Sequence, residues 1–311
     1  MENALQTKKR TRSGKKSTSV VFLAIALVVL IAYTLFLFFL LGWGFVASFK
    51  SDLDFILYPD KLLPAKELGG FHFKNYITAF KGMRVPLNRG QSEGYVYADK
   101  MLLYSLYWVV GSALLNTFST MLVAYCCARF HNKLFSKIIY VGTVFAISIP
   151  LIGTAPAQMK LVSQLHLYNS LLLMPAFKLS FISTYFLVFY AIFLKVPAGF
   201  REAAEIDGAG HWTIFFKVNF PMVMNTAVAV FILFFIQYWN DYSVPMMYLP
   251  SYPTLAQGLY ELMNGQASRD PRMHTGVSLA AALMVAVPPL VLFVAFRSKI
   301  MANVSVGGLK G

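Results

Sequence analysis

Residues 197–212 of the sequence read PAGFREAAEIDGAGHW. Pro197 ends the apolar segment before it, because proline lacks the N–H donor that a continuing helix needs. Residues 202–206 favour a short helix, and Gly208 then favours a turn that ends it. Pro221 suits the first turn of the next helix. The stretch therefore predicts a helical elbow between two apolar segments, with small residues on its outer surface.

Working outward from the elbow, six segments are long, apolar and almost free of charge. A membrane-spanning helix needs roughly 20 such residues. The predicted spans are residues 20–47, 101–128, 138–159, 179–196, 221–241 and 275–297. Only 13% of the residues are charged, about half of the usual share in a soluble protein. We therefore expect an all-α integral membrane protein with six transmembrane helices, which together form one domain over residues 20–298.

A seventh uncharged run covers residues 161–177. It is short for a span and carries several polar side chains, so we interpret it as an interfacial or re-entrant piece outside the membrane. The paired prolines Pro288 and Pro289 lie within the last predicted span, where they remove two backbone donors. A kink at which the helix bends and a static kink are equally compatible with this pair.

Basic residues are distributed unequally among the segments that join these spans. The N-terminal tail (residues 1–19), the loops 129–137 and 195–217, and the C-terminal end from residue 297 contain 15 Lys and Arg against four Asp and Glu. Because positively charged segments remain in the cytoplasm, we expect both termini there, and residues 50–100 in a loop outside. The net charge of +14 thus reflects membrane topology, and we predict no nucleic-acid partner.

The residues that usually carry catalysis or bind metals form no pattern here. Cys126 and Cys127 are adjacent, which would strain a disulfide between them. The five histidines never show the spacing of a helical metal site, and the sequence contains no phosphate-binding loop of the Walker type. We therefore expect no metal, no cofactor and no enzymatic activity on this chain.

The elbow resembles the EAA loop of ABC-importer permeases, here residues 198–220. In that motif Glu-Ala-Ala, a glycine and a proline recur at fixed spacing, and Glu202–Ala204, Gly208 and Pro221 fall in register. Val218 and Phe220 replace the isoleucine and leucine of the pattern and keep its apolar character. The longer stretch from Glu202 to Ala209 is similar to that of the carbohydrate-uptake class, which contains the maltose-type permeases. Weaker matches to the family lie at residues 48–50, 73–76, 124–125, 128–129, 239–242 and 308–311.

This resemblance implies a subunit of an importer in a bacterial-type cell membrane. Two sister permeases would share two ABC ATPase subunits, which bind ATP and Mg, while an extracytoplasmic solute-binding protein delivers a sugar or oligosaccharide. The present chain would supply half of the pathway through the lipid bilayer. Its elbow would dock in a cleft on an ATPase, and its C-terminal tail (residues 299–311) would reach the ATPase dimer interface. The coupling residues implied are Glu202, Ala203, Ala204, Asp207 and Gly208.

Polar and aromatic residues in or beside the spans are candidates for the substrate path. Asp241 abuts the fifth span, and ionisable groups at membrane depth are usually functional. Its aromatic and amide neighbours could stack on and hydrogen-bond to a sugar, although an interfacial aromatic belt has the same composition. The full candidate set is Asn116, Gln158, Trp239, Asn240, Asp241 and Tyr242.

Other functions remain as alternatives. Permeases for polyamines, phosphate or amino acids also carry EAA loops. An ion-coupled secondary transporter would show charged or interrupted helices at mid-bilayer and often an inverted repeat, and neither is visible here. A polytopic membrane enzyme would need catalytic side chains that converge on one side of the membrane, and the sequence offers none.

Overall fold

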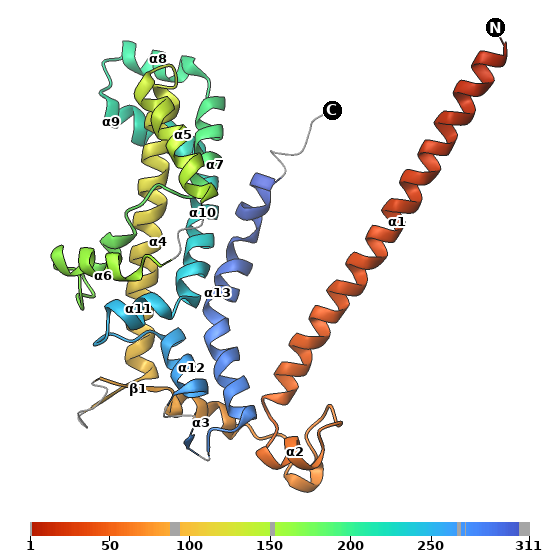
Figure 1. Ribbon diagram of the computed structural model, residues 1–311, viewed down its shortest axis with the longest axis vertical. Helices are drawn as coiled ribbons and strands as arrows, with labels where there is room; N and C mark the ends of the chain where they lie inside the picture. Colours follow the sequence, from red (N-terminus) through yellow and green to blue (C-terminus); the bar gives the residue numbers. More distant parts are fainter. Residues whose placement is uncertain (1, 88–93, 150–152, 266–268, 271, 305–311) are drawn as a thin grey trace. The chain divides into compact units, whose positions relative to one another are not determined.

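The computed structural model describes residues 2–87, 94–149, 153–265, 269–270 and 272–304, and most of them are helical (Figure 1). The chain divides into two compact units. The first comprises Met1–Tyr76 with His274–Ala280, and the second comprises Ile77–Met273 with Ala281–Gly311. From position 305 onward, the predicted C-terminal tail lies outside the described residues.

The first unit begins with the long helix α1 (Glu2–Ala47). By length and composition, its part from Val21 to Ala47 qualifies as a membrane span. Its apolar side chains from Val21 to Leu41 are exposed, which is the arrangement expected of a helix that meets lipid. The unit continues with α2 (Asp52–Leu57), the 3-10 turn η1 (Lys66–Leu68) and the start of α3 (Lys74–Gly82).

Buried contacts fold the chain that follows α1 back onto itself. The side-chain amide of Asn75 donates hydrogen bonds to the carbonyl oxygens of Ser48 and Lys50, at 2.8 and 2.9 Å. Gly276, near the start of α13 (Thr275–Val304), lies against the Lys50 carbonyl, where a Cβ would have no room. The ring of Phe49 contacts those of Phe71, Phe73 and Tyr76. The first part of the predicted outer loop is therefore an ordered structure.

The second unit is built around α4 (Ala98–Arg129), a helix of 32 residues with a length of about 48 Å. It packs against α7 (Thr184–Lys195) and α10 (Phe220–Asn240). Its buried face is rich in small side chains, which allow membrane helices to approach closely: Ser105, Ser112, Ala113, Thr117, Thr120 and Ala124. Larger side chains, among them Trp108, Phe186, Phe189 and Ile232, complete this core.

Shorter elements complete the second unit. The antiparallel strands β1 (Arg84–Pro86) and β2 (Tyr95–Tyr97) pair Val85 with Val96 just before α4. After α4 come α5 (Leu134–Ser148), α6 (Ala155–Gln164) and the 3-10 turn η2 (Met174–Lys178). The elbow contains α8 (Ala198–Ile206), α9 (His211–Thr213) and the π-helical turn η3 (Ile214–Asn219). Beyond α10 lie α11 (Ser243–Tyr248) and α12 (Leu255–Asn264).

Four of the described helices are long and apolar enough to cross a membrane: Val21–Ala47, Ala98–Arg129, His211–Asn240 and Thr275–Lys299. The other two predicted spans, 138–159 and 179–196, correspond to the shorter apolar helices α5, of 15 residues, and α7, of 12 residues. Helix α5 ends before Ile149, whose backbone is extended, as expected of a residue that precedes a proline. The structure thus supports a mostly helical, multi-pass membrane protein with two shorter helices among its apolar segments.

Three further sequence expectations can be placed on the structure. Between Gln164 and Thr184 the described helical element is the 3-10 helix η2, so residues 161–177 contain no helix long enough to span a membrane. The helical stretch that contains α10 begins at His211, ten residues before the predicted start of the fifth span. Helix α13 continues through Pro288 and Pro289.

Candidate coupling site

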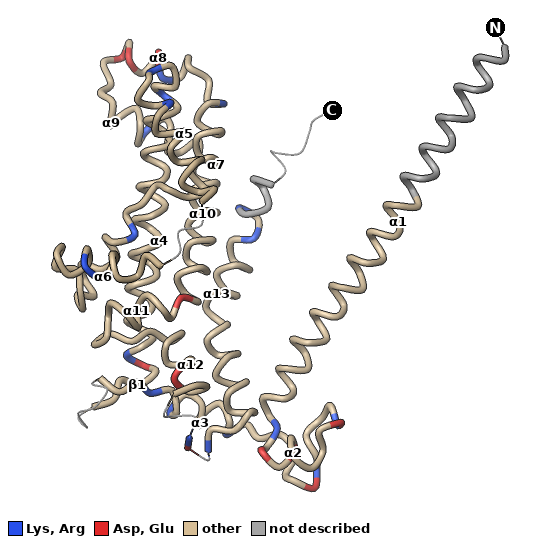
Figure 2. Tube along the Cα trace, in the orientation of Figure 1, with Lys and Arg blue, Asp and Glu red and all other residues tan. Residues whose placement is uncertain are grey.

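Helix α8 lies at one end of the second unit, next to the end of α4 (Figure 1). The chain leaves α7 at Lys195, and Val196 and Pro197 adopt extended backbone before α8 begins at Ala198. Pro197 therefore separates the two helices, as its missing N–H predicts. Figure 2 shows that charged residues gather around α8, whereas α4 and α10 are uncharged along most of their length.

The end of α8 has the hydrogen bonds of a Schellman motif. The N–H of Gly208 donates to the carbonyl of Glu205 at 3.1 Å, and the N–H of Ala209 donates to that of Ala204 at 2.9 Å. Gly208 has a φ of +78°, a left-handed conformation that only glycine adopts without cost. Asp207, the residue before it, is the C-cap of the helix. The predicted turn at Gly208 is present, and its positive φ explains why this position carries a glycine.

The outer surface of the elbow is unusually apolar. None of the nine residues of α8, all of them described, is buried. Phe200, Ile206 and Trp212 are exposed, and Ile206 reaches 86% exposure. Ala203 is exposed and Ala204 is half-buried, so the predicted small-residue surface is present between these larger side chains. Phe200 and Ile206 lie outside the candidate membrane spans, where apolar exposure of this kind commonly marks a protein-binding surface.

Ion pairs connect α8 with the end of α4. A guanidinium nitrogen of Arg129 lies 2.8 Å from a carboxylate oxygen of Glu205, and Arg201 lies 3.8 Å from the same oxygen. Arg201 also lies 3.8 Å from Glu202, whose side chain is 61% exposed. Glu202 is thus available to a partner, whereas Glu205 is engaged within the chain.

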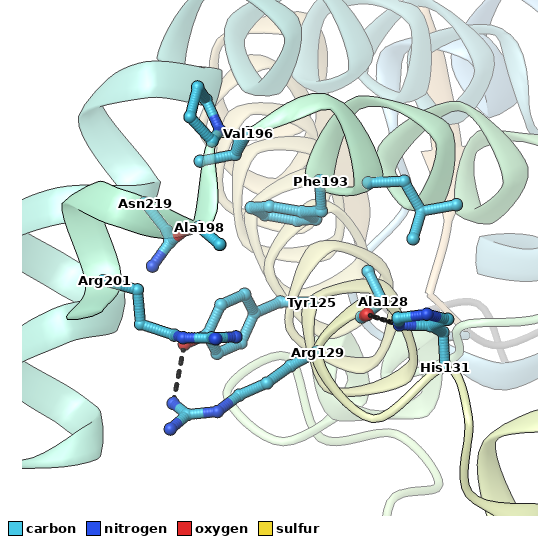
Figure 3. A pocket seen from close by; sticks show the side chains of 11 residues that line it. Tyr125, Ala128, Arg129, His131, Phe193, Val196, Ala198, Arg201 and Asn219 are labelled. Carbon is cyan, nitrogen blue, oxygen red and sulfur yellow. Dashed lines mark hydrogen bonds between the residues drawn. The ribbon is translucent and has the colours of Figure 1, made fainter.

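A cavity of about 230 Å³ lies beneath the start of α8. Figure 3 shows Arg129 and Arg201 beside it, with Tyr125 between α4 and the elbow. The Tyr125 hydroxyl accepts a hydrogen bond from Arg129 at 3.1 Å. The remaining walls come from the ends of α4 and α7 and from Asn219 of η3. Arg129, Glu205 and Tyr125 were not among the predicted site residues, although Arg129 is the first charged residue after the second predicted span.

The predicted substrate-path residues fall into separate structural settings. Asn116 is buried in α4, where it donates to the Tyr238 hydroxyl and accepts from Thr120. Trp239 is also buried, and its indole N–H donates to the carbonyl of Val285 at 2.9 Å. Gln158 lies on α6 and accepts a hydrogen bond of 3.4 Å from the Tyr248 hydroxyl. These three side chains therefore already have partners within the chain.

The remaining three candidates lie at the end of α10. Asp241 accepts hydrogen bonds from the backbone N–H groups of Ser243 and Val244, at 3.0 and 3.1 Å, and from the Ser243 hydroxyl at 2.8 Å. Asn240 donates back to its own helix, and the ring of Tyr242 stacks on that of Tyr260 at 4.6 Å. Among the described residues, no two of the six candidates share a side-chain hydrogen bond.

A cationic side chain, Lys178, lies near these residues and was not among the predicted site residues. The ammonium of Lys178, at the end of η2, lies 5.1 Å from the ring centre of Tyr238 and 6.0 Å from that of Trp108. Such contacts are favourable because the ring faces are electron-rich. As for metals, no group of His, Cys, Asp and Glu in the described part of the chain could hold an ion.

Comparison with known proteins gives three concordant results. A family model for the inner membrane component of binding-protein-dependent transport systems matches residues 120–298. The diacetylchitobiose uptake system permease protein NgcG of Streptomyces coelicolor is 26% identical over 92% of this chain and 88% of its own length. The melibiose/raffinose/stachyose import permease protein MelC of Bacillus subtilis is 28% identical over 64% and 72%.

A solved structure shows the same fold. It is a bacterial ABC transporter involved in the import of the acidic polysaccharide alginate, and one of its chains aligns with a TM-score of 0.67. The alignment covers 90% of this chain and 96% of that one at 17% identity. The likeness therefore concerns the arrangement of the helices.

Proposed function

Because the chain belongs to the family of inner membrane components of binding-protein-dependent transport systems, we propose that it forms half of the membrane pathway of an ATP-driven importer for an oligosaccharide. The family membership confirms the prediction of an ABC-importer permease subunit. Such subunits are non-catalytic, and an independent enzyme or an ion-coupled transporter has no support. NgcG and MelC are both named as uptake proteins for sugars, which favours a carbohydrate over polyamines, phosphate or amino acids.

The observation that carries the mechanism is the exposed elbow at the charged end of the second unit. In the proposed assembly α8 inserts into a cleft on an ABC ATPase subunit, with the apolar side chains of Phe200 and Ile206 at the contact. Glu202, Ala203, Ala204, Asp207 and Gly208 form the coupling segment. The exposed carboxylate of Glu202 can pair with a basic residue of the ATPase, and Gly208 holds the turn that directs α8 outward.

The assembly would contain this chain, a sister permease, two ATPases that hold ATP and Mg, and an extracytoplasmic solute-binding protein. Closure of the ATPases would move the elbows and change which side of the membrane the pathway faces. Both termini would lie in the cytoplasm with the elbow, since the sequence segments assigned to that side of the membrane hold most of the excess of basic residues. Asn116, Gln158, Trp239, Asn240, Asp241 and Tyr242 remain candidates for contact with the sugar.

Replacing Gly208 by valine tests the docking assignment. The φ of +78° at this position would cost a valine about 1–2 kcal/mol, so the turn should change direction. Gly70→Val is the matched control, because Gly70 also has a positive φ, of +69°, and open space around it, but lies in the first unit. We expect both variants to reach the membrane, and only Gly208→Val to lose ATPase co-purification and sugar uptake. Normal uptake and co-purification by Gly208→Val would refute docking through α8.

Reconstitution tests the function itself. Proteoliposomes that contain both permeases, the ATPases and the solute-binding protein should accumulate a radiolabelled oligosaccharide only with ATP. Uptake by this chain alone, without another gene product, would contradict the proposal.

A further inference from the structure

Helix α8 is attached to the second unit by polar contacts. None of its nine residues, each of them described, is buried, and a cavity of about 230 Å³ lies below its first turn. A helix without a buried apolar face gains little from packing, whereas packing supplies most of the stability of helices in proteins. The covalent connections, the contact with η3 and the ion pairs of Glu205 therefore determine where α8 sits.

Arg129 is the member of these contacts that belongs to the core of the second unit. It is the last residue of α4, and its side chain is only 11% exposed. One terminal nitrogen donates to the Tyr125 hydroxyl at 3.1 Å, and the other donates to Glu205 at 2.8 Å. The planar guanidinium is thus held at two points, which gives the pair a defined geometry.

The helix to which Arg129 belongs is well placed to distribute a movement. Helix α4 packs along both α7 and α10, and the ring of Tyr125 contacts those of Phe193 and Phe215. A displacement of Glu205 would therefore reach α4 through a short charge-assisted hydrogen bond and then spread through packed rings. Glu205 itself lies outside the EAA pattern, so the resemblance assigns it no role.

We propose that Arg129 is a positioning residue that transmits the movement of α8 to α4 through Glu205. This inference rests on the proposed docking of α8, and it adds the connection between the docking helix and the membrane helices. Arg201 acts as a weaker neighbour, since its distance to Glu205 is 3.8 Å and its side chain is more exposed than that of Arg129. The pair Arg129–Glu205 converts a force on an exposed helix into a movement of a buried one.

The functional test compares four variants in the complete reconstituted importer: Arg129→Gln, Glu205→Gln, the double exchange Arg129→Glu with Glu205→Arg, and Arg272→Gln as the control. Arg272 also forms a close ion pair, at 2.7 Å with Asp270, but it lies outside the coupling site. We expect the first two to assemble with the ATPases and hydrolyse ATP, but to lose uptake per ATP by about tenfold, within the range for residues that carry coupling. The double exchange should recover part of this loss, and Arg272→Gln should stay near the wild type. Uptake per ATP that is unchanged in Arg129→Gln would overturn the proposal.

A second measurement separates this proposal from the docking assignment. A spin label attached through Ile206→Cys, in full-length chain with Cys126→Ser and Cys127→Ala, reports the mobility of α8 before any ATPase is added. Ile206 is exposed and the two native cysteines are free. Arg129→Gln should increase the mobility of the label, and Arg201→Gln should change it less. An unchanged label in Arg129→Gln would refute the positioning role, even if Gly208→Val had already shown that α8 docks on the ATPase.

Discussion

At the scale of single residues, Asp54 of the short helix α2 shows how a buried charge can be stabilised by hydrogen bonds. Its carboxylate accepts hydrogen bonds from the N–H and hydroxyl of Ser51, both at 2.9 Å, and from the N–H of Ala65 at 2.8 Å. Burial by itself would raise the pKa of Asp54, but the Ala65 and Ser51 hydrogen bonds outweigh it and hold the pKa below its ordinary value. The carboxylate thus fastens α2 to the segment that follows it.

We predict that Asp54→Asn lowers the free energy of unfolding by about 1–3 kcal/mol, because one buried donor loses its acceptor. Asp52→Asn is the control, since Asp52 is exposed on the same helix. Thermal unfolding of the purified protein in detergent measures both. A pKa that is lowered by folding stabilises the protein above the ordinary value of 3.8, and this contribution is lost as the pH falls through the lower folded value. Equal stability of the two variants at pH 7 would contradict the assignment.

At the scale of the helices, Asp241 has two alternative roles, the capping of helix α11 and the binding of substrate. All three of its hydrogen bonds reach one oxygen, Oδ1, and they come from the first residues of α11. This is the behaviour of a side chain that satisfies the free donors at a helix start. A substrate-binding carboxylate would instead need its negative charge.

The capping role predicts different effects for two substitutions. Asp241→Asn keeps an oxygen at the Oδ1 position and should retain stability and uptake close to the wild type. Asp241→Ala removes the acceptor and should lower stability by about 1 kcal/mol, measured as a reduced unfolding temperature. Loss of uptake in Asp241→Asn at normal stability would instead place this carboxylate in the substrate path.

The helices α5 and α7 are shorter than the apolar segments in which they lie. Each charge-free run marks an apolar segment, and two of these segments contain helices of only 15 and 12 residues. Helix α5 ends at Ser148 and α7 begins at Thr184, because extended residues at Ile149 and Ser183 interrupt the helical backbone. Hydrophobicity indicates which segments can be transferred into lipid. Proline and the local hydrogen bonds determine where a helix ends.

At the scale of the whole molecule, the proposed orientation in the membrane follows from the unequal distribution of charge. It predicts that Lys66→Cys, in the outer loop, reacts with a membrane-impermeant maleimide on intact spheroplasts. His211→Cys, on the elbow, should react only after the membrane is opened. Both residues are exposed, and both variants need the background without Cys126 and Cys127. The reverse pattern of labelling would contradict the proposed orientation and indicate the opposite topology.

The apolar runs, the elbow and the glycine turn follow from the sequence by itself. These features depend on local chemistry: side-chain transfer into lipid, the missing donor of Pro197 and the positive φ of Gly208. The motif at 202–208 also indicated the transporter family, which the comparisons confirm. Such features are encoded within a few neighbouring residues.

The contacts between residues that are far apart in the sequence became visible only in the folded chain. Arg129 and Glu205 are 76 positions apart, and nothing in their local sequence pairs them. Asn116 and Tyr238 meet across 122 positions, so a side chain that seemed free for a sugar already has a partner. Because such contacts depend on how whole helices cross and rotate against each other, the spacing of residues along the chain does not contain them.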